Sequence, residues 1–291
     1  MGSTVNRYYE EDTGRTVVYG YEDEVSAVPI AQLEEWRENK RRKEIIKHGA
    51  TKHYVNCYHE PVAELNSVLK VNELGALMKL IPYIKMHTKG ALYFEGSRMS
   101  VSLIAKAIDR SPRQANTIVE ALYVAGVLWR EKIGRSYVYG VKERYHSMGY
   151  VIDGANFTKV FQVKTRTDIR NISIQAAGVL YKMLPFFNYE HFVLCTNPNE
   201  ADIEKIYPVS HREFAERVGV DRKVIERGIK ELTRFGFLGK FSSYNGELYI
   251  VNPDVASRRK STSDESTEAA RNTFRLAEKA SAEVAIGELP F

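Results

Sequence analysis

Apolar residues recur at helical spacing in the first half of the chain. Over residues 73–86 they fall three and four positions apart, which predicts a buried helix despite Pro82 near its end. Residues 91–94 are short and aromatic, lie between glycines, and predict a strand. Apolar positions at helical spacing return over residues 100–108, where we expect a second helix capped by Ser100.

A tight turn and a further helix follow. Asp109 and Arg110 form the turn, and Ser111 is suited to cap a helix whose first residue is Pro112. This helix is predicted to run to about residue 125, where Gly126 ends it. Two apolar stretches then surround a polar turn at residues 132–135, which predicts a β-hairpin.

The chain repeats this pattern. Residues 75–83 (GALMKLIPY) resemble residues 178–186 (GVLYKMLPF) at an offset of 103, and residues 54–58 match residues 157–161 at the same offset. Residues 104–128 and 214–238 align at an offset of 110. The seven additional residues fall in the polar stretch 193–209, where a loop lengthens at little cost. A two-copy pattern of this kind indicates one supersecondary unit used twice.

The second copy predicts the same elements. Residues 214–218 form the first helix, Gly219 and Val220 the turn, and Asp221 caps a helix that runs to residue 235. The order of helix, strand, helix, turn, helix and hairpin is that of a winged helix-turn-helix. The expected fold class is therefore α+β, mainly α, with tandem winged helix-turn-helix domains and a flexible C-terminal tail.

Four segments follow from this pattern. Residues 1–53 are an acidic leader followed by a basic helix, residues 54–146 are winged helix 1, and residues 147–255 are winged helix 2. Residues 256–291 are polar and poor in apolar positions, which predicts a flexible tail with a transient helix over residues 265–284.

The second helix of a helix-turn-helix lies in the major groove of DNA, where its first turns reach base edges. Arginine suits guanine, and glutamine and asparagine suit adenine, each through two hydrogen bonds. In the first copy the predicted DNA-binding residues are Arg113, Gln114, Asn116 and Thr117, with Arg130, Lys132 and Arg135 on the hairpin. In the second copy they are Arg222, Lys223, Arg227, Lys230 and Lys240. Alternatively, the exposed faces of these helices are merely solvated, or the winged helices bind other proteins.

The distribution of charge supports a nucleic-acid partner. The 291 residues carry a formal charge of +5, but residues 1–35 hold two basic and eight acidic side chains. Residues 61–145 hold 13 basic and seven acidic side chains, so the basic excess coincides with the first copy. Phosphate neutralisation supplies most non-specific affinity for nucleic acid. The basic stretch at residues 36–52 suggests either a phosphate contact from Lys40–Lys43 or an exposed amphipathic helix.

No motif in the sequence supports catalysis. The chain lacks a phosphate-binding loop of the G-x-x-x-x-G-K-[ST] type, which argues against a nucleotide-driven motor. The two histidines around one residue that a rolling-circle nickase uses are also missing, since Cys57-Tyr58-His59 is the nearest approach. His48, His53, Cys57 and His59 are close in sequence, but no second ligand pair follows. We therefore expect a non-enzyme with no metal and no cofactor.

Composition points to a cytoplasmic protein. No uncharged apolar stretch approaches the length of a membrane span, and the N-terminus has no secretory pattern. The two cysteines, Cys57 and Cys195, fit a reducing compartment.

The chain ends in Gly-Glu-Leu-Pro-Phe, which resembles the C-terminus of bacterial single-stranded DNA-binding proteins. In those proteins the terminal ring fills an apolar pocket and the acidic groups meet basic residues. The resemblance implies that Glu288, Leu289, Pro290 and Phe291 dock on host replication proteins, although the acidic run of that family is missing here. A sliding-clamp peptide is an alternative.

The first 150 residues resemble the replication initiators of Firmicute plasmids of the RepL type and related phage proteins. The resemblance rests on an acidic opening with residues 11–15 (EDTGR), a basic segment, an aromatic-flanked strand and a winged helix. Residues 157–161 (FTKVF) and 249–253 (YIVNP) also fit the family pattern. The family has one winged helix, whereas this chain has two. The resemblance implies binding to an origin in double-stranded DNA and recruitment of host replication machinery.

Two other hypotheses remain open at this point. The same grip on DNA suits a transcriptional regulator of the MarR-like kind, and a winged helix can also act as a scaffold for proteins alone. Two copies in one chain can substitute for a dimer, so a monomer and a homodimer both stay open.

Overall fold

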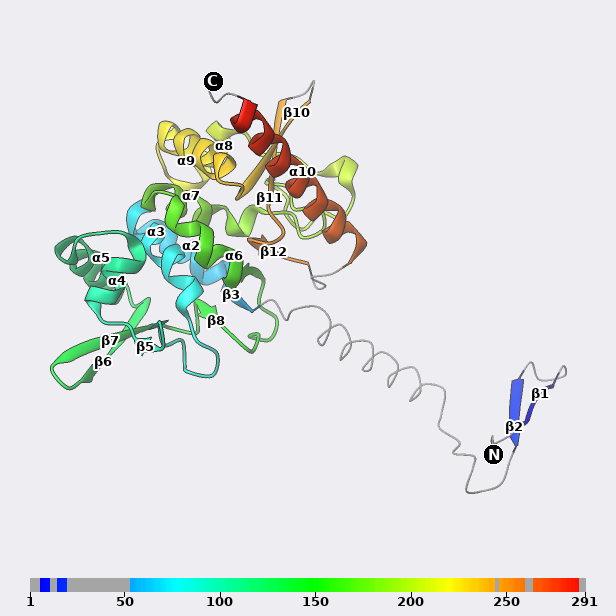
Figure 1. Cartoon of the computed structure of the whole chain (residues 1–291), viewed down its shortest axis with the longest axis horizontal. Coiled ribbons are helices and arrows are strands. Elements are labelled where there is room, and N and C mark those ends of the chain that lie inside the picture. The colour runs from blue at the N-terminus through cyan, green and yellow to red at the C-terminus, as the bar shows by residue number, and fades with distance from the viewer. Residues whose placement is uncertain (1–5, 11–14, 20–52, 244–245, 260–263, 288–291) are drawn as a thin grey trace. The chain divides into compact units, whose positions relative to one another are not determined.

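The structure is a computed structural model that describes residues 6–10, 15–19, 53–243, 246–259 and 264–287. It divides into two compact units, Met1–Thr51 and Lys52–Phe291. In the first unit, β1 (Asn6–Glu10) pairs antiparallel with β2 (Arg15–Tyr19). The second unit contains both copies of the repeat and has an α+β fold in which helix predominates (Figure 1).

The elements of the two copies follow one another in the same order. The first copy comprises β3 (Tyr54–Tyr58), α2 (His59–Val68), α3 (Val71–Leu80), η1 (Ile81–Tyr83), β4 (Tyr93–Phe94), β5 (Ser97–Arg98), α4 (Val101–Ile108), α5 (Pro112–Val124), β6 (Leu128–Ile133), β7 (Ser136–Val141) and β8 (His146–Ser147). The second comprises β9 (Phe157–Phe161), α6 (Gln162–Asp168), η2 (Ile169–Asn171), α7 (Ile174–Met183), η3 (Leu184–Phe186), η4 (Ile203–Lys205), α8 (His211–Val218), α9 (Arg222–Arg234), β10 (Leu238–Ser243), β11 (Gly246–Val251) and β12 (Ala256–Ser257). The helix α10 (Glu265–Gly287) follows.

Two local predictions need correction. The helix expected over residues 73–86 is α3, which ends at Leu80 and tightens into η1, because Pro82 has no N–H to continue the α-helical ladder. Ser100 does occupy the cap position of α4, but its hydroxyl makes no capping bond and instead lies 2.8 Å from the hydroxyl of Ser102.

A four-stranded sheet joins the two copies, in the order β12-β9-β3-β8. The central strands β3 and β9 are antiparallel, and Asn56 lies opposite Lys159, its own counterpart at the offset of 103. On the outer strands, Ser147 pairs with Asn56 and Ser257 with Lys159, and these serines are counterparts at the offset of 110. A pseudo-two-fold axis therefore passes between Asn56 and Lys159.

The helices α3 and α7 cross at the repeated glycines and lie side by side in the centre of the unit (Figure 1). A Cβ atom on Gly75 would lie 1.8 Å from the carbonyl oxygen of Ile174, and one on Gly178 would lie 2.0 Å from that of Val71. Val71 and Ile174 are also counterparts. The two backbones thus approach to a distance that only glycine allows at both positions.

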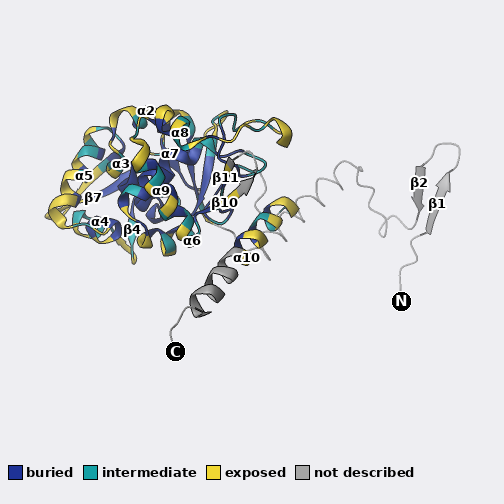
Figure 2. Ribbon diagram, turned by 90° about the horizontal axis from the view of Figure 1, so that it is seen from above, coloured by how far each residue is buried: buried dark blue, intermediate teal, exposed yellow. Residues whose placement is uncertain are grey.

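Each copy attaches its hairpin to a short third strand. In the first copy the N–H of Leu92 donates to the carbonyl of Tyr139 at 3.1 Å, and in the second that of Leu194 donates to Tyr249 at 2.8 Å. Apolar residues of both copies form one continuous core, which is dark blue in Figure 2. The boundary expected between residues 146 and 147 falls inside β8, so residues 54–146 and 147–255 share one compact unit.

The C-terminal segment differs from the flexible tail expected for residues 256–291. Its first residues complete the sheet as β12, and the beginning of α10 packs on the second copy. Phe274 is 6% exposed and its ring lies against Gly239 of β10. Arg271 is 4% exposed and pairs with Asp254 at 2.7 Å. The transient helix expected over residues 265–284 is an α-helix over 265–287 that is anchored at its start.

Candidate nucleic-acid interface

The turn between α4 and α5 is fixed by local chemistry that the sequence predicts correctly. Asp109 adopts the left-handed conformation, with φ +54°, and ends α4. Ser111 caps α5: its hydroxyl accepts a hydrogen bond from the N–H of Gln114 at 3.3 Å. Pro112 occupies the first turn, where its missing N–H costs nothing. The N-terminal end of α5 is thereby held in place.

The outer face of α5 carries the predicted side chains. Arg113, Gln114, Asn116 and Thr117 are all exposed, while the inner face of the helix is buried in the core (Figure 2). Among the described residues, none pairs with the guanidinium of Arg113 or the amide of Asn116. Both side chains are therefore available to base edges.

Two of the predicted residues on α5 have a structural role. The side-chain oxygen of Gln114 accepts bonds from the backbone N–H of Ser111 at 3.3 Å and from its hydroxyl at 3.2 Å. Thr117 donates its hydroxyl to the carbonyl of Arg113 at 3.2 Å. The amide nitrogen of Gln114 stays available as a donor, but the two-point contact with adenine requires release of the cap.

The hairpin residues of the first copy differ in their contacts. The guanidinium of Arg130 lies 4.1 Å from the ring centroid of Tyr123 and 4.8 Å from that of Tyr137. It also lies 3.5 Å from Glu120. Lys132 and Arg135 are exposed near the tip, where Gly134 takes φ +59°. Arg130 is thus held between two rings, while Lys132 and Arg135 reach into solvent.

The second copy presents α9 in the same manner. Asp221 caps the helix by accepting from the N–H of Lys223 at 2.8 Å, as the sequence predicts, and Gly219 forms the turn with φ +63°. Lys223, Arg227 and Lys230 are exposed on the outer face.

Two of the predicted cations in the second copy are paired with carboxylates. Arg222 bonds to Glu226 at 2.7 Å, and Lys240 pairs with Glu247 on the neighbouring strand. The hydrogen bonds from Lys240 and from the Tyr249 hydroxyl lower the pKa of Glu247, so the carboxylate keeps its charge. A phosphate contact by Arg222 or Lys240 must compete with these carboxylates.

Two lysines at counterpart positions of the central helices α3 and α7 are buried. Lys182 on α7 donates to the carbonyl of Val218 at 3.1 Å, directly before the Gly219 turn, and burial lowers its pKa to about 8. Its counterpart Lys79 on α3 is 2% exposed, and burial lowers its pKa while Asp109 in the turn of the first copy favours its charge. Lys182 therefore ties α7 to the turn before α9. In the sequence, the signal for their structural role is that both copies have lysine at this position.

The remaining candidate residues of the sequence are the C-terminal peptide, the basic stretch and the His and Cys side chains. Glu288, Leu289, Pro290 and Phe291, and the basic residues Lys40–Lys43, lie outside the described residues. Within the part of the chain that the structure describes, no three His, Cys, Asp or Glu side chains are grouped to hold a metal ion. Cys57 is fully buried, and His59 lies 2.9 Å from the hydroxyl of Thr158.

Comparison with protein-family models, with curated proteins and with solved structures gives no match. No described helix is long and apolar enough to cross a membrane.

Proposed function

We propose that this chain is a double-stranded-DNA-binding replication protein of a plasmid or phage, built from two winged helices. In this proposal α5 and α9 are the recognition helices that lie in the major groove, and the hairpins β6–β7 and β10–β11 are the wings. The exposed, unpaired Arg113 at the start of a capped helix is the observation that carries the proposal. A helix-turn-helix reads bases with these N-terminal positions.

The pseudo-two-fold axis supports a bipartite DNA site. A dimeric helix-turn-helix protein presents two recognition helices related by a two-fold axis and binds two half-sites. Here one chain supplies both helices, held together by the β3–β9 pairing and the crossing of α3 with α7. In this proposal a single chain binds both half-sites of the DNA, as the two subunits of a dimeric helix-turn-helix protein do.

The two recognition helices offer different chemistry. The outer face of α5 carries mostly neutral hydrogen-bonding groups beside Arg113, whereas that of α9 carries Lys223, Arg227 and Lys230. Neutral amides discriminate bases, and cations attract phosphate of any sequence. The half-site under α5 would supply more of the sequence specificity, and the half-site under α9 more of the salt-dependent affinity.

The replication role draws on the resemblance of residues 1–150 to RepL-type initiators. Recruitment of host replication proteins is assigned to residues 288–291, as that resemblance and the C-terminal sequence suggest. A transcriptional regulator is the second candidate, and it is favoured by the pseudo-two-fold arrangement, because palindromic operators are read in this geometry.

Genome-wide capture of DNA by the native protein in its host tests the proposal. One dominant peak at a replication origin, lost in Arg113→Ala and kept in Arg275→Ala, is the expected result. Arg275 is an exposed arginine on α10, so its removal changes the net charge equally. Peaks over promoters would make the protein a regulator, and no enrichment sensitive to Arg113 would overturn DNA binding.

A further inference from the structure

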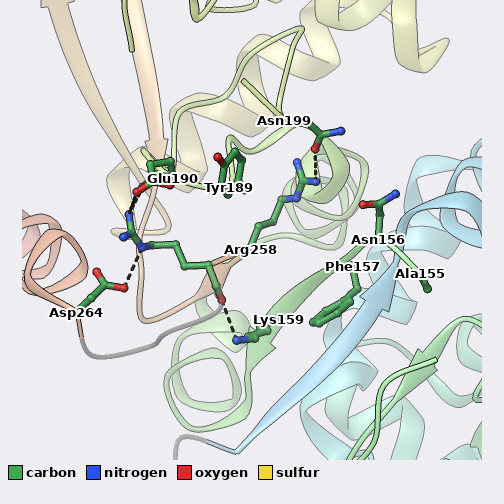
Figure 3. A pocket seen from close by; sticks show the side chains of 10 residues that line it. Ala155, Asn156, Phe157, Lys159, Tyr189, Glu190, Asn199, Arg258 and Asp264 are labelled. Atoms are coloured by element: carbon green, nitrogen blue, oxygen red, sulfur yellow. Dashed lines mark hydrogen bonds and ion pairs between the residues drawn. The ribbon is translucent and has the colours of Figure 1, made fainter. Parts of the chain in front are cut away.

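A hollow of about 660 Å³ lies in the second copy, away from the exposed face of α9. Phe157 and Lys159 of β9 line one side of it, and Tyr189 and Asn199 line the opposite side (Figure 3). Arg258, directly after β12, extends between the two sides. Mixed apolar and cationic walls of this size are typical of small-molecule sites.

The first copy fills the corresponding place. Counterparts at the two repeat offsets place Met86 opposite Tyr189 in the alignment, and Met148 and Gly149 opposite Arg258 and Arg259. In the first copy Met86 packs so closely on Gly149 that a Cβ there would lie 2.9 Å from Cγ of Met86. Where the first copy has this apolar packing, the second copy has cations and aromatic rings around an open space. The inserted stretch 193–209, which contains Asn199, contributes to the wall.

The charge of Arg258 has neutral partners. Its guanidinium donates to the carbonyls of Phe187 at 3.0 Å and Pro198 at 3.2 Å, and to the side-chain oxygen of Asn199 at 2.7 Å. No carboxylate among the described residues forms an ion pair with it. Burial lowers the pKa of Arg258 to about 10. Glu60 favours this charge without forming an ion pair with it. A partly buried cation whose hydrogen-bond partners are all neutral is stabilised by an anion that enters beside it.

The neighbouring Arg259 provides the contrast. It pairs with Asp264 at 3.0 Å and with Glu190 at 3.3 Å, so these two carboxylates are already occupied. Lys159 is 6% exposed, donates to the carbonyl of Arg259 at 2.8 Å, and lies on the wall of the hollow. Its counterpart on the pseudo-two-fold axis is the neutral Asn56.

We propose that this hollow binds a small organic phosphate of nucleotide size, with the phosphate beside Arg258 and Lys159. Guanidinium and ammonium groups form strong charge-assisted bonds with phosphate oxygens. The rings of Phe157 and Tyr189 supply apolar faces on which a planar base stacks. The proposal is independent of DNA binding by α5 and α9, since it uses none of their residues.

The repeat provides the variants that test this site. Arg258→Met, Lys159→Asn and Tyr189→Met each install the residue that the first copy carries at the same position. Isothermal titration calorimetry of the full chain with AMP, GMP, ATP and inorganic phosphate measures binding. We expect at least one nucleotide to bind, and Arg258→Met to weaken that binding about tenfold or more, as loss of a charge-assisted bond does. Arg275→Met is the matched control and is expected to bind as the unaltered chain does.

The melting temperature of each variant separates lost binding from lost folding. If Arg258→Met does not fold, Lys159→Asn and Tyr189→Met still decide the outcome, and either one weakening nucleotide binding supports the site. Absence of binding by all three nucleotides would overturn the proposal. Equal affinity in the folded variants, or inorganic phosphate binding as tightly as the nucleotides, would do so as well. DNA capture by the same protein preparations tests the proposed DNA binding separately, so failure of one proposal does not imply failure of the other.

Discussion

At the scale of single residues, the exposed side chains of α5 carry the proposed recognition of bases. Arg113 and Asn116 are exposed without described partners, whereas Gln114 takes part in the cap of its own helix. The sequence identifies all three by their position after a capping serine. The spacing of Ser111 and Gln114 is also that of a capping box, and this spacing is the signal that Gln114 is engaged by its own helix.

A cation of the first hairpin is also engaged by its neighbours. Arg130 looks like a phosphate contact in the sequence, but the rings of Tyr123 and Tyr137 enclose its guanidinium. Tyr137 lies seven residues beyond Arg130, on the opposite strand of the hairpin. The pairing register brings them together, and composition alone does not give it.

Arg113→Ala is expected to weaken binding to the preferred duplex by about 1–3 kcal/mol, because a two-point contact with a base is lost. Affinity for unrelated duplexes should change far less. Fluorescence anisotropy with the two kinds of duplex measures both values, with Arg275→Ala as the control. An equal loss for both duplexes would mean that Arg113 contacts only phosphate.

Stability should fall in mild acid because two histidines are buried in their neutral form. Burial lowers the pKa of His146 to about 3, and burial together with Arg258 lowers that of His59 to about 3. In the unfolded chain both titrate near 6.5, so the unfolded state binds more protons below that pH. Their contribution is present above pH 6.5 and is lost as the pH falls toward 3.

From pH 7.5 to 5.5 the two histidines together should cost about 2–3 kcal/mol of unfolding free energy. Urea titrations at the two pH values measure this change. The variant His146→Gln, which cannot be protonated, should show a smaller difference between them. An unfolding free energy independent of pH would contradict the buried neutral state.

At the scale of elements, the crossing of α3 and α7 holds the two copies in their relation. Gly75→Ala is expected to destabilise the chain by about 3 kcal/mol or more, because the methyl group would overlap the carbonyl of Ile174. Asn72→Ala, at an exposed position of α3, is the control and should have little effect. Thermal and urea unfolding measure both. A tolerated alanine at position 75 would show that the helices can separate.

Most elements of the repeat could be predicted from the sequence, because caps and turns act locally. Ser111, Asp221 and Gly219 take the roles that their residue types suggest, and Asp109 closes the predicted turn. The pairing of Tyr54–Tyr58 with the strand 157–161 could not be predicted, although their likeness was visible. Similar sequences indicate similar structures, and they do not indicate that the two structures pair with each other.

The sequence predicts where α10 begins, but not that its first turns pack on the second copy. Its composition is that of a solvated segment, yet Thr267, Arg271 and Phe274 are buried. The partners of Phe274 and Arg271, Gly239 and Asp254, lie on other elements of the second copy. Contacts between distant residues decide whether such a segment is ordered, so propensity alone underestimates it.

At the scale of the compact unit Lys52–Phe291, symmetry and its local breaking carry the functional account. The pseudo-two-fold axis relates the two copies of the repeat, while the hollow around Arg258 occurs in the second copy where the first has packed methionines. The symmetric features belong to the proposed binding of DNA. The asymmetric one fits a separate ligand.

The two halves of the DNA site should respond differently to salt. We expect the triple replacement of Lys223, Arg227 and Lys230 by alanine to make the slope of log affinity against log salt concentration shallower. The loss should correspond to at most about three phosphate contacts. Affinity should fall for every duplex. Asn116→Ala should leave the salt dependence unchanged and reduce discrimination between duplexes. Anisotropy titrations over a series of salt concentrations separate the two effects.

Selection of duplexes from a random library by the full chain, followed by footprinting of the selected site, tests the central claim most directly. We predict one enriched site with two protected segments about one helical turn apart, or a multiple of it, in inverted orientation. Arg113→Ala should lose protection over one segment, while Arg275→Ala keeps both. A library without enrichment, or protection that Arg113→Ala leaves unchanged, would contradict recognition of double-stranded DNA by this chain.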